Sequence, residues 1–173
     1  TPDALGKATA FIRAMKSEGD TDIFDSLQSF MEEKRQPGRP MIAFVVSDGV
    51  PTVGITDSSR IIGQFSRVNR GAVSVFSMGT SGSANTYLLD LLSYRNRGDT
   101  YVVTSGRWDI PAHLEARVRS FSRPLLADLA VVFSAAHECE GYPVMPSNLY
   151  LDRPLELFCR YPKDLDVLVF QVT

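Results

Sequence analysis

The most informative segment of the chain is an apolar run that ends abruptly at an acidic turn. The run covers residues 41–46 (MIAFVV), and Ser47, Asp48 and Gly49 follow it. A strand that is apolar at every position is typical of a parallel sheet covered on both faces, so we expect 41–46 to be buried and not a solvent edge. Because open α/β sheets bind ligands beyond the carboxyl ends of their strands, Asp48 is a candidate site residue.

A plain turn is the alternative interpretation of Asp48, since Asp bonds its own backbone and Gly tolerates positive φ. Thr21 adds weight to the site hypothesis. It lies in the loop 17–23, between two helical patterns and just before a helix N-terminus. Its hydroxyl is there either to face a ligand or to cap the helix, which is the commoner role of Thr at such a position.

Apolar residues recur at helical spacing in two segments that precede the strand. The first segment begins at Thr1 and ends at Gly19, and the second begins at the N-cap candidate Asp22 and is broken by Pro37-Gly38. We expect their apolar residues to belong to the core. These are Leu5, Ala8, Phe11, Ile12 and Met15 in the first helix, and Ile23, Leu27, Phe30 and Met31 in the second.

Helical and strand patterns then alternate as far as residue 121. The predicted elements are a helix from Thr56 or Asp57 that closes at Asn69-Arg70-Gly71, a strand 72–78, a helix 84–94, a strand 101–103, and a helix introduced by Trp108-Asp109. The inward residues are Ile61, Ile62, Phe65 and Val68 in the first of these helices, and Leu114, Val118 and Phe121 in the last. This order predicts right-handed crossovers and an α/β fold with a doubly wound, mostly parallel sheet.

From residue 123 onward the pattern contains strands alone. We expect strands at 126–133, 155–161 and 167–172, with the last two joined as an antiparallel hairpin through the turn 162–164. Residues 134–153 read as a long irregular loop. The chain therefore divides into an α/β part, 1–122, and a small all-β appendage, 123–173. Cys139 and Cys159 both lie in the appendage, and their spacing leaves a disulfide between them open.

Two loops carry a resemblance to a known family. Gly19-Asp20-Thr21 and Ser47-Asp48-Gly49 match the second and third metal-binding motifs of the von Willebrand factor A family. Residues 73–79, 87–92 and 96–98 continue the resemblance, and residues 123–129 narrow it to inter-alpha-trypsin inhibitor heavy chains and their bacterial relatives. The resemblance implies a Rossmann-like fold whose first strands are missing here, so that this chain is a fragment containing the C-terminal part of the domain.

The resemblance also implies a divalent-cation site for Mg²⁺, or for Mn²⁺ or Ca²⁺, with Thr21 and Asp48 as ligands. The family's first motif, Asp-x-Ser-x-Ser, is absent, and Asp57-Ser58-Ser59 lacks the second serine at the required spacing. Asp20 stands where the family usually has Gly, so the backbone loses some freedom at this position, and a carboxylate near the cation is the other consequence that we consider. We therefore expect an incomplete site that holds Mg²⁺ weakly or not at all in this chain.

The function implied by the resemblance is that of an adhesion or protein-binding module whose cation meets a carboxylate of a partner protein. Missing first strands would leave the strand 41–46 with an unpaired edge, which invites pairing. We expect the missing strands to come from an upstream segment of the same protein, from a cleaved companion chain, or from the partner in a homodimer. The resemblance alone favours an exported or cell-surface location.

Two other functions compete with this one. A metal-dependent phosphoryl- or ester-transfer enzyme would use Asp48 as nucleophile or metal anchor. The sequence shows no Gly-x-Ser-x-Gly elbow or Gly-rich phosphate loop, and no Cys/His pair or second carboxylate near Asp48, so we expect no enzyme. A scaffold domain with a decayed metal site is the third reading. Nucleic acid is not an expected partner, because the formal net charge is −2.

Overall fold

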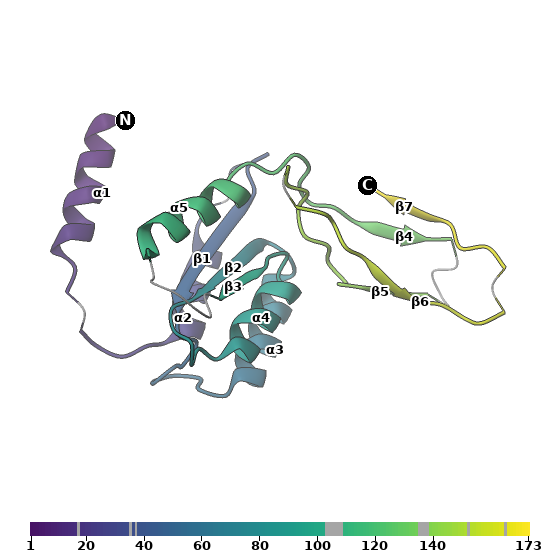
Figure 1. Cartoon of the computed structure of the whole chain (residues 1–173), viewed down its shortest axis with the longest axis horizontal. Helices are drawn as coiled ribbons and strands as arrows, with labels where there is room; N and C mark the ends of the chain where they lie inside the picture. The colour runs from purple at the N-terminus through teal and green to yellow at the C-terminus, as the bar shows by residue number, and fades with distance from the viewer. Residues whose placement is uncertain are drawn as a thin grey trace.

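The computed structural model describes residues 1–16, 18–34, 36, 38–102, 109–134, 139–151, 153–164 and 166–173. The predicted positions Pro37, Val103 and Trp108 lie outside these ranges. The helices are α1 (Pro2–Ala14), α2 (Ile23–Glu32), α3 (Ser58–Asn69), α4 (Thr86–Arg95) and α5 (Ile110–Phe121). The strands are β1 (Met41–Ser47), β2 (Val73–Gly79), β3 (Thr100–Val102), β4 (Val131–Phe133), β5 (Glu140–Tyr142), β6 (Phe158–Arg160) and β7 (Phe170–Val172). Figure 1 shows their arrangement.

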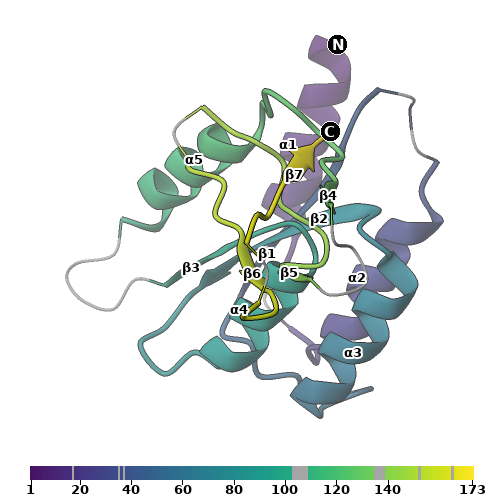
Figure 2. The same ribbon diagram turned by 90° about the vertical axis from the view of Figure 1, so that its right-hand side faces the viewer.

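Three parallel strands form the central sheet, in the order β1-β2-β3. Every residue of β2 is buried, because β2 has a neighbour on each side and helices on both faces. Figure 2 shows α5 on one side of these strands and α3 and α4 on the other. The predicted mixture of helices and strands around a parallel sheet is confirmed, and it is compatible with an α/β fold.

The two faces of the sheet bury different side chains. Val73 and Val75 of β2 pack with residues of α2, α3 and α4 in the larger core cluster. On the opposite face, the ring of Phe76 stacks on Phe121 of α5, with centroids 4.3 Å apart. Tyr150, which lies in the C-terminal part of the chain, covers the same face with its ring edge against Phe76. The C-terminal segment thus completes the core that α5 begins.

Helix starts follow the local sequence signals. Asp22, Asp57 and Asp109 cap α2, α3 and α5, each accepting a hydrogen bond from the backbone N–H three residues ahead. Arg70 ends α3 in the left-handed conformation at φ 48°, and Gly71 follows at φ 73°. The predicted beginnings of these helices and the predicted end of α3 are confirmed.

The burial of β1 differs from the expectation. Only Ala43 of this strand is fully buried, and Val46 is 44% exposed. Within the described residues β1 pairs with β2 alone, so its second edge carries no strand. The expectation that 41–46 is not a solvent edge is therefore wrong for this chain, whereas the expected unpaired edge is present.

The apolar face of α1 is also exposed, contrary to the prediction that it is core. No residue of α1 is buried, and Leu5 is 70% exposed. Figure 1 shows α1 standing apart from the other helices. The periodicity correctly predicted an amphipathic helix, but no described element covers its apolar face. Three predicted core residues outside α1 are likewise exposed: Phe30, Val68 and Val118.

The C-terminal strands pair differently from the prediction. β4 pairs with β7 and β5 pairs with β6, both antiparallel, so 155–161 and 167–172 are not a hairpin. The predicted irregular loop 134–153 contains β5. Gly141 of β5 lies close to the Phe133 ring of β4, since a Cβ on Gly141 would be 2.7 Å from that ring. The two small sheets are therefore in contact. Cys159 is an exposed free thiol in β6.

Buried and half-buried polar contacts attach the appendage to the α/β part. Asn148 donates to the Ser74 hydroxyl of β2 at 3.3 Å. Arg97, between α4 and β3, donates to the carbonyl oxygens of Leu129 and Pro146, each at 3.2 Å. These bonds cross the predicted boundary after residue 122, and the division into two domains stays a prediction.

Candidate functional site

Thr21 and Asp48 line the same cavity, although they are 27 residues apart in the sequence. The cavity has a volume of about 790 Å³ and lies beside the open edge of β1, between that strand and the start of α2. Both side chains are exposed. The structure thus brings together the two residues predicted as metal ligands, one from a helix start and one from a strand end.

Two loops hold this arrangement through backbone hydrogen bonds. The Thr21 N–H donates to the Thr52 hydroxyl at 2.8 Å, and the Thr21 carbonyl accepts from the Thr52 N–H at 2.9 Å. Thr52 therefore fixes the Thr21 loop against the loop that carries Asp48. Sequence reasoning did not find this role, since no local pattern distinguishes a threonine that binds a distant backbone.

Asp48 is held by its own turn. One carboxylate oxygen accepts the Val50 N–H at 3.0 Å, and the backbone carbonyl accepts the Asn85 N–H at 2.7 Å. Gly49 has φ 71°, and a Cβ there would lie 3.0 Å from both the Asn85 carbonyl oxygen and a Leu89 side-chain carbon. The turn interpretation of Asp48-Gly49 is therefore correct locally, and it also directs the loop toward the start of α4.

The other oxygen atoms of the cavity are largely engaged within the protein. Asp22 caps α2, and the Ser26 hydroxyl donates to the Asp22 carbonyl at 2.6 Å. The Ser47 hydroxyl oxygen accepts the Gly49 N–H at 3.0 Å. Asp20 receives a bond of 3.4 Å from the Thr52 hydroxyl. The carboxylate and hydroxyl oxygens of these residues are hard ligand atoms of the kind that Mg²⁺ prefers.

The number of suitable ligands is smaller than a cation cage needs. In the described part of the chain, no group of three or more His, Cys, Asp or Glu side chains is placed to hold a metal ion. Asp57 and Ser58 do not complete the set, because Asp57 caps α3 and the Ser58 hydroxyl accepts from the Asn85 amide at 3.0 Å. The oxygen atoms of Thr21 and Asp48 fit the chemistry of a hard divalent cation, and the described residues around them do not form a complete carboxylate cage.

The cavity offers little for acid–base catalysis. Its described lining residues include no histidine, cysteine or lysine beside Asp48. Such residues are frequent partners of a nucleophile or a general base. The carboxylates that line the cavity with Asp48 are those of Asp20 and Asp22.

Comparison with known proteins shows a similarity over most of the chain. The chain is 30% identical over 133 residues to inter-alpha-trypsin inhibitor heavy chain H6 from Homo sapiens, an alignment that covers 70% of this chain and 10% of that protein. No protein-family model matches the chain. The similarity indicates a relationship to a heavy chain of this type, as the sequence resemblance implied. The chain spans about a tenth of the length of this relative.

No helix in the described ranges combines the length and the apolar character that crossing a bilayer requires.

Proposed function

We propose that this protein is an interaction module that contacts a partner protein through a divalent cation held in part by Thr21 and Asp48. The observation that carries the proposal is that both side chains line one cavity at the carboxyl end of β1. The similarity to an inter-alpha-trypsin inhibitor heavy chain supports interaction rather than catalysis. A von Willebrand factor A domain of the heavy-chain type is the finer assignment that we propose.

In this proposal the chain's own residues have distinct tasks. The Thr21 hydroxyl ligates Mg²⁺, Mn²⁺ or Ca²⁺, and the Asp48 carboxylate does so directly or through a bound water. Thr52 positions Thr21 by accepting its backbone N–H. A bound cation supplies the positive charge that attracts a carboxylate of the partner, since hard cations favour oxygen ligands.

A strand from outside this chain completes the sheet at the open edge of β1. Support comes from β1, which pairs on one side only, and from the exposed apolar face of α1. The strand comes from one of three sources: an upstream segment of a longer protein, a cleaved companion chain, or a second copy of this chain. Light scattering coupled to size-exclusion chromatography separates the second copy from the others: a dimer at micromolar concentration identifies self-pairing, whereas a monomer with fast-exchanging β1 amides identifies an external segment.

Manganese titration followed by NMR tests the cation site. Because Mn²⁺ is paramagnetic, it broadens the amide signals of residues near its binding site. We expect broadening centred on the loops of Thr21 and Asp48, with a dissociation constant of about 1 mM, because only part of a cage is present. Asp48→Asn and Thr21→Ala should remove it, Thr21→Ser should retain it, and Asp90→Asn should leave it unchanged as an exposed carboxylate control on α4.

Two results decide between the proposal and its competitors. Uniform broadening that Asp48→Asn does not alter would sink the cation site and favour a scaffold domain whose site has decayed. Phosphatase or esterase activity that is lost in Asp48→Asn would favour the enzyme instead.

A further inference from the structure

A second cavity lies away from Thr21 and Asp48, between two helices and the segment that follows β5. Its volume is about 750 Å³, and it runs beside the C-terminal halves of α3 and α4. Its lining residues are Gly63, Ser66, Arg67, Leu91, Tyr94, Arg95, Tyr142, Pro143, Val144 and Met145. We refer to this feature as the α3–α4 groove.

The groove has apolar walls that are open to solvent. Val144 is 82% exposed, and Tyr94 and Tyr142 are also exposed. On the opposite wall, a Cβ added to Gly63 of α3 would meet no atom within 4 Å. A bulky side chain at position 63 would therefore enter the groove without displacing core residues. An open groove with such walls suits a segment of a protein better than a free lipid, which binds in an enclosed site.

The charge of the groove has one sign. Arg67 and Arg95 occupy the last turns of α3 and α4, and neither forms an ion pair within the described residues. No lining residue is acidic. The nearby Glu140 is already engaged, since it accepts the Tyr142 hydroxyl at 2.8 Å and lies 3.7 Å from Arg160. The negative end of each helix dipole stabilises the positive charge of the arginine in its last turn. Both charges remain available to an anionic ligand.

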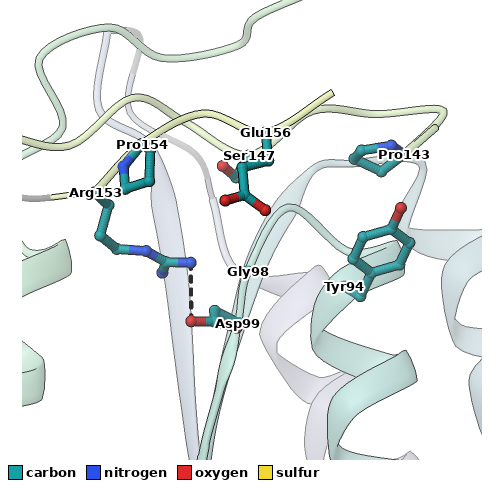
Figure 3. Close-up of a pocket in the computed structure, with 8 residues that line it drawn as sticks. All are labelled: Tyr94, Gly98, Asp99, Pro143, Ser147, Arg153, Pro154 and Glu156. Carbon is teal, nitrogen blue, oxygen red and sulfur yellow. Dashed lines mark ion pairs between the residues drawn. The ribbon is translucent and has the colours of Figure 1, made fainter. Parts of the chain in front are cut away.

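A smaller cavity of about 290 Å³ adjoins the groove and shares Tyr94 and Pro143 with it. Figure 3 shows these two rings near each other at one side of that cavity and the Arg153–Asp99 ion pair at the other. Arg153 is neutralised by Asp99 at 2.9 Å, and Glu156 adds a negative charge. Positive charge is thus concentrated at the α3–α4 end, which sets a direction for a ligand that extends over both cavities.

We propose that the α3–α4 groove docks a short segment of a partner protein in which carboxylates flank large apolar side chains. The carboxylates pair with Arg67 and Arg95, and the apolar side chains pack on Leu91, Tyr94 and Pro143. This surface is independent of the cation proposed at Thr21 and Asp48, so chelation leaves it intact.

Fluorescence anisotropy tests the proposal with the whole chain. The probe is a fluorescein-labelled peptide of sequence Glu-Glu-Leu-Phe-Glu-Glu, and the matched peptide carries Gln at every Glu. We expect saturable binding of the acidic peptide below about 1 mM, at least about tenfold weaker binding of the Gln peptide, and no change with EDTA. Insensitivity to EDTA separates this result from the fate of the cation site.

Variants locate the binding. Gly63→Phe fills the groove and should weaken binding about tenfold or more, whereas Gly63→Ala leaves the groove open and should stay within about twofold. The double change Arg67→Glu with Arg95→Glu alters only exposed side chains, which keeps the fold intact, and should abolish binding. Three results would each overturn the proposal. The acidic peptide shows no saturable binding, or it binds the wild type, Gly63→Phe and the double arginine variant equally well, or oleate micelles by themselves displace it.

Discussion

The hydroxyl oxygen of Thr52 accepts a hydrogen bond of 2.8 Å from the backbone N–H of Thr21, and the Thr52 N–H returns one of 2.9 Å to the Thr21 carbonyl. This reciprocal pair joins the loop before α2 to the loop after β1. Thr21 faces the cavity because of that pairing, so the geometry of the candidate site depends on a residue that does not itself need to bind the ligand.

Replacing Thr52 by Val should loosen this connection. Val has the same shape but no acceptor, so the Thr21 N–H loses its partner, and we expect the free energy of unfolding to fall by about 0.5–1.5 kcal/mol. Hydrogen exchange at the Thr21 amide should become faster, and urea unfolding gives the stability. Thr52→Ser keeps the hydroxyl and serves as the control. Unchanged exchange in Thr52→Val would show that the bond does not hold the loop in solution.

A buried amide pair makes a larger contribution. Asn69, the last residue of α3, donates to the Asn96 side-chain oxygen at 2.8 Å, and Asn96 donates in turn to the Ser66 hydroxyl at 2.9 Å. Asn96→Ala leaves buried polar groups without partners, so we expect a loss of about 2–4 kcal/mol in urea unfolding. Gln28→Ala, on the exposed face of α2, should change stability by less than about 0.5 kcal/mol.

A double-mutant cycle identifies the pair itself. If Asn69 and Asn96 act together, the combined Asn69→Ala and Asn96→Ala variant should lose less stability than the sum of the single variants, by at least about 0.5 kcal/mol. Strict additivity would mean that the two amides contribute separately.

The Tyr150 hydroxyl predicts a pH effect. It is buried without a hydrogen-bond partner among the described atoms, and burial raises the pKa of this hydroxyl above its ordinary value of 10.0, with smaller opposing effects of Asn148 and Arg153. Because the folded pKa is the higher one, the contribution to stability is complete below about pH 10 and is lost as the pH rises through the folded pKa.

As the pH rises from about 9 to about 11, the free energy of unfolding should therefore fall less for Tyr150→Phe than for the wild type, as measured by urea unfolding at each pH. At pH 7 the variant should be about as stable as the wild type, or more stable by up to about 1 kcal/mol, since an unpaired hydroxyl is removed. Tyr87→Phe, whose ring is 54% exposed, is the control. Parallel pH curves for wild type and Tyr150→Phe would contradict the assignment.

Local signals explain what the sequence could predict. Asp57 and Asp109 cap their helices through bonds to N–H groups three residues away, and such contacts are readable from spacing alone. Asp48 was predicted as a site residue because it follows the carboxyl end of a strand. Its pairing with Thr21 was predicted from the resemblance to the von Willebrand factor A motifs and not from local signals.

Nonlocal pairing explains what could not be predicted. β7 pairs with β4 and not with β6, although the turn residues at 162–164 favour a hairpin. Three-residue ladders contribute little register information. The close approach of Phe133 to Gly141 joins segments of different strands, and no local pattern indicates it. The anchoring role of Thr52 was missed for the same reason, since its partner is remote in the chain.

The last prediction concerns the apolar stripe of α1. Helical periodicity shows which residues share an apolar face, but it does not show whether another element covers that face. Leu5 is 70% exposed, whereas Leu27 in α2 is 3% exposed within the main cluster. Leu27→Ala should lower the free energy of unfolding by about 2–5 kcal/mol. Leu5→Ala should change it by less than about 0.5 kcal/mol, because little apolar surface is removed from water at that position.

Measuring the stability of both variants at several protein concentrations tests what covers the apolar stripe of α1. In dilute solution, thermal unfolding should separate the two variants as stated, with no dependence on concentration. If Leu5→Ala becomes strongly destabilising as the concentration rises, the stripe is covered by a second copy of the chain. If Leu5→Ala instead matters only after a longer form of the protein is prepared, an upstream segment covers the stripe, and that segment is the source of the strand expected beside β1.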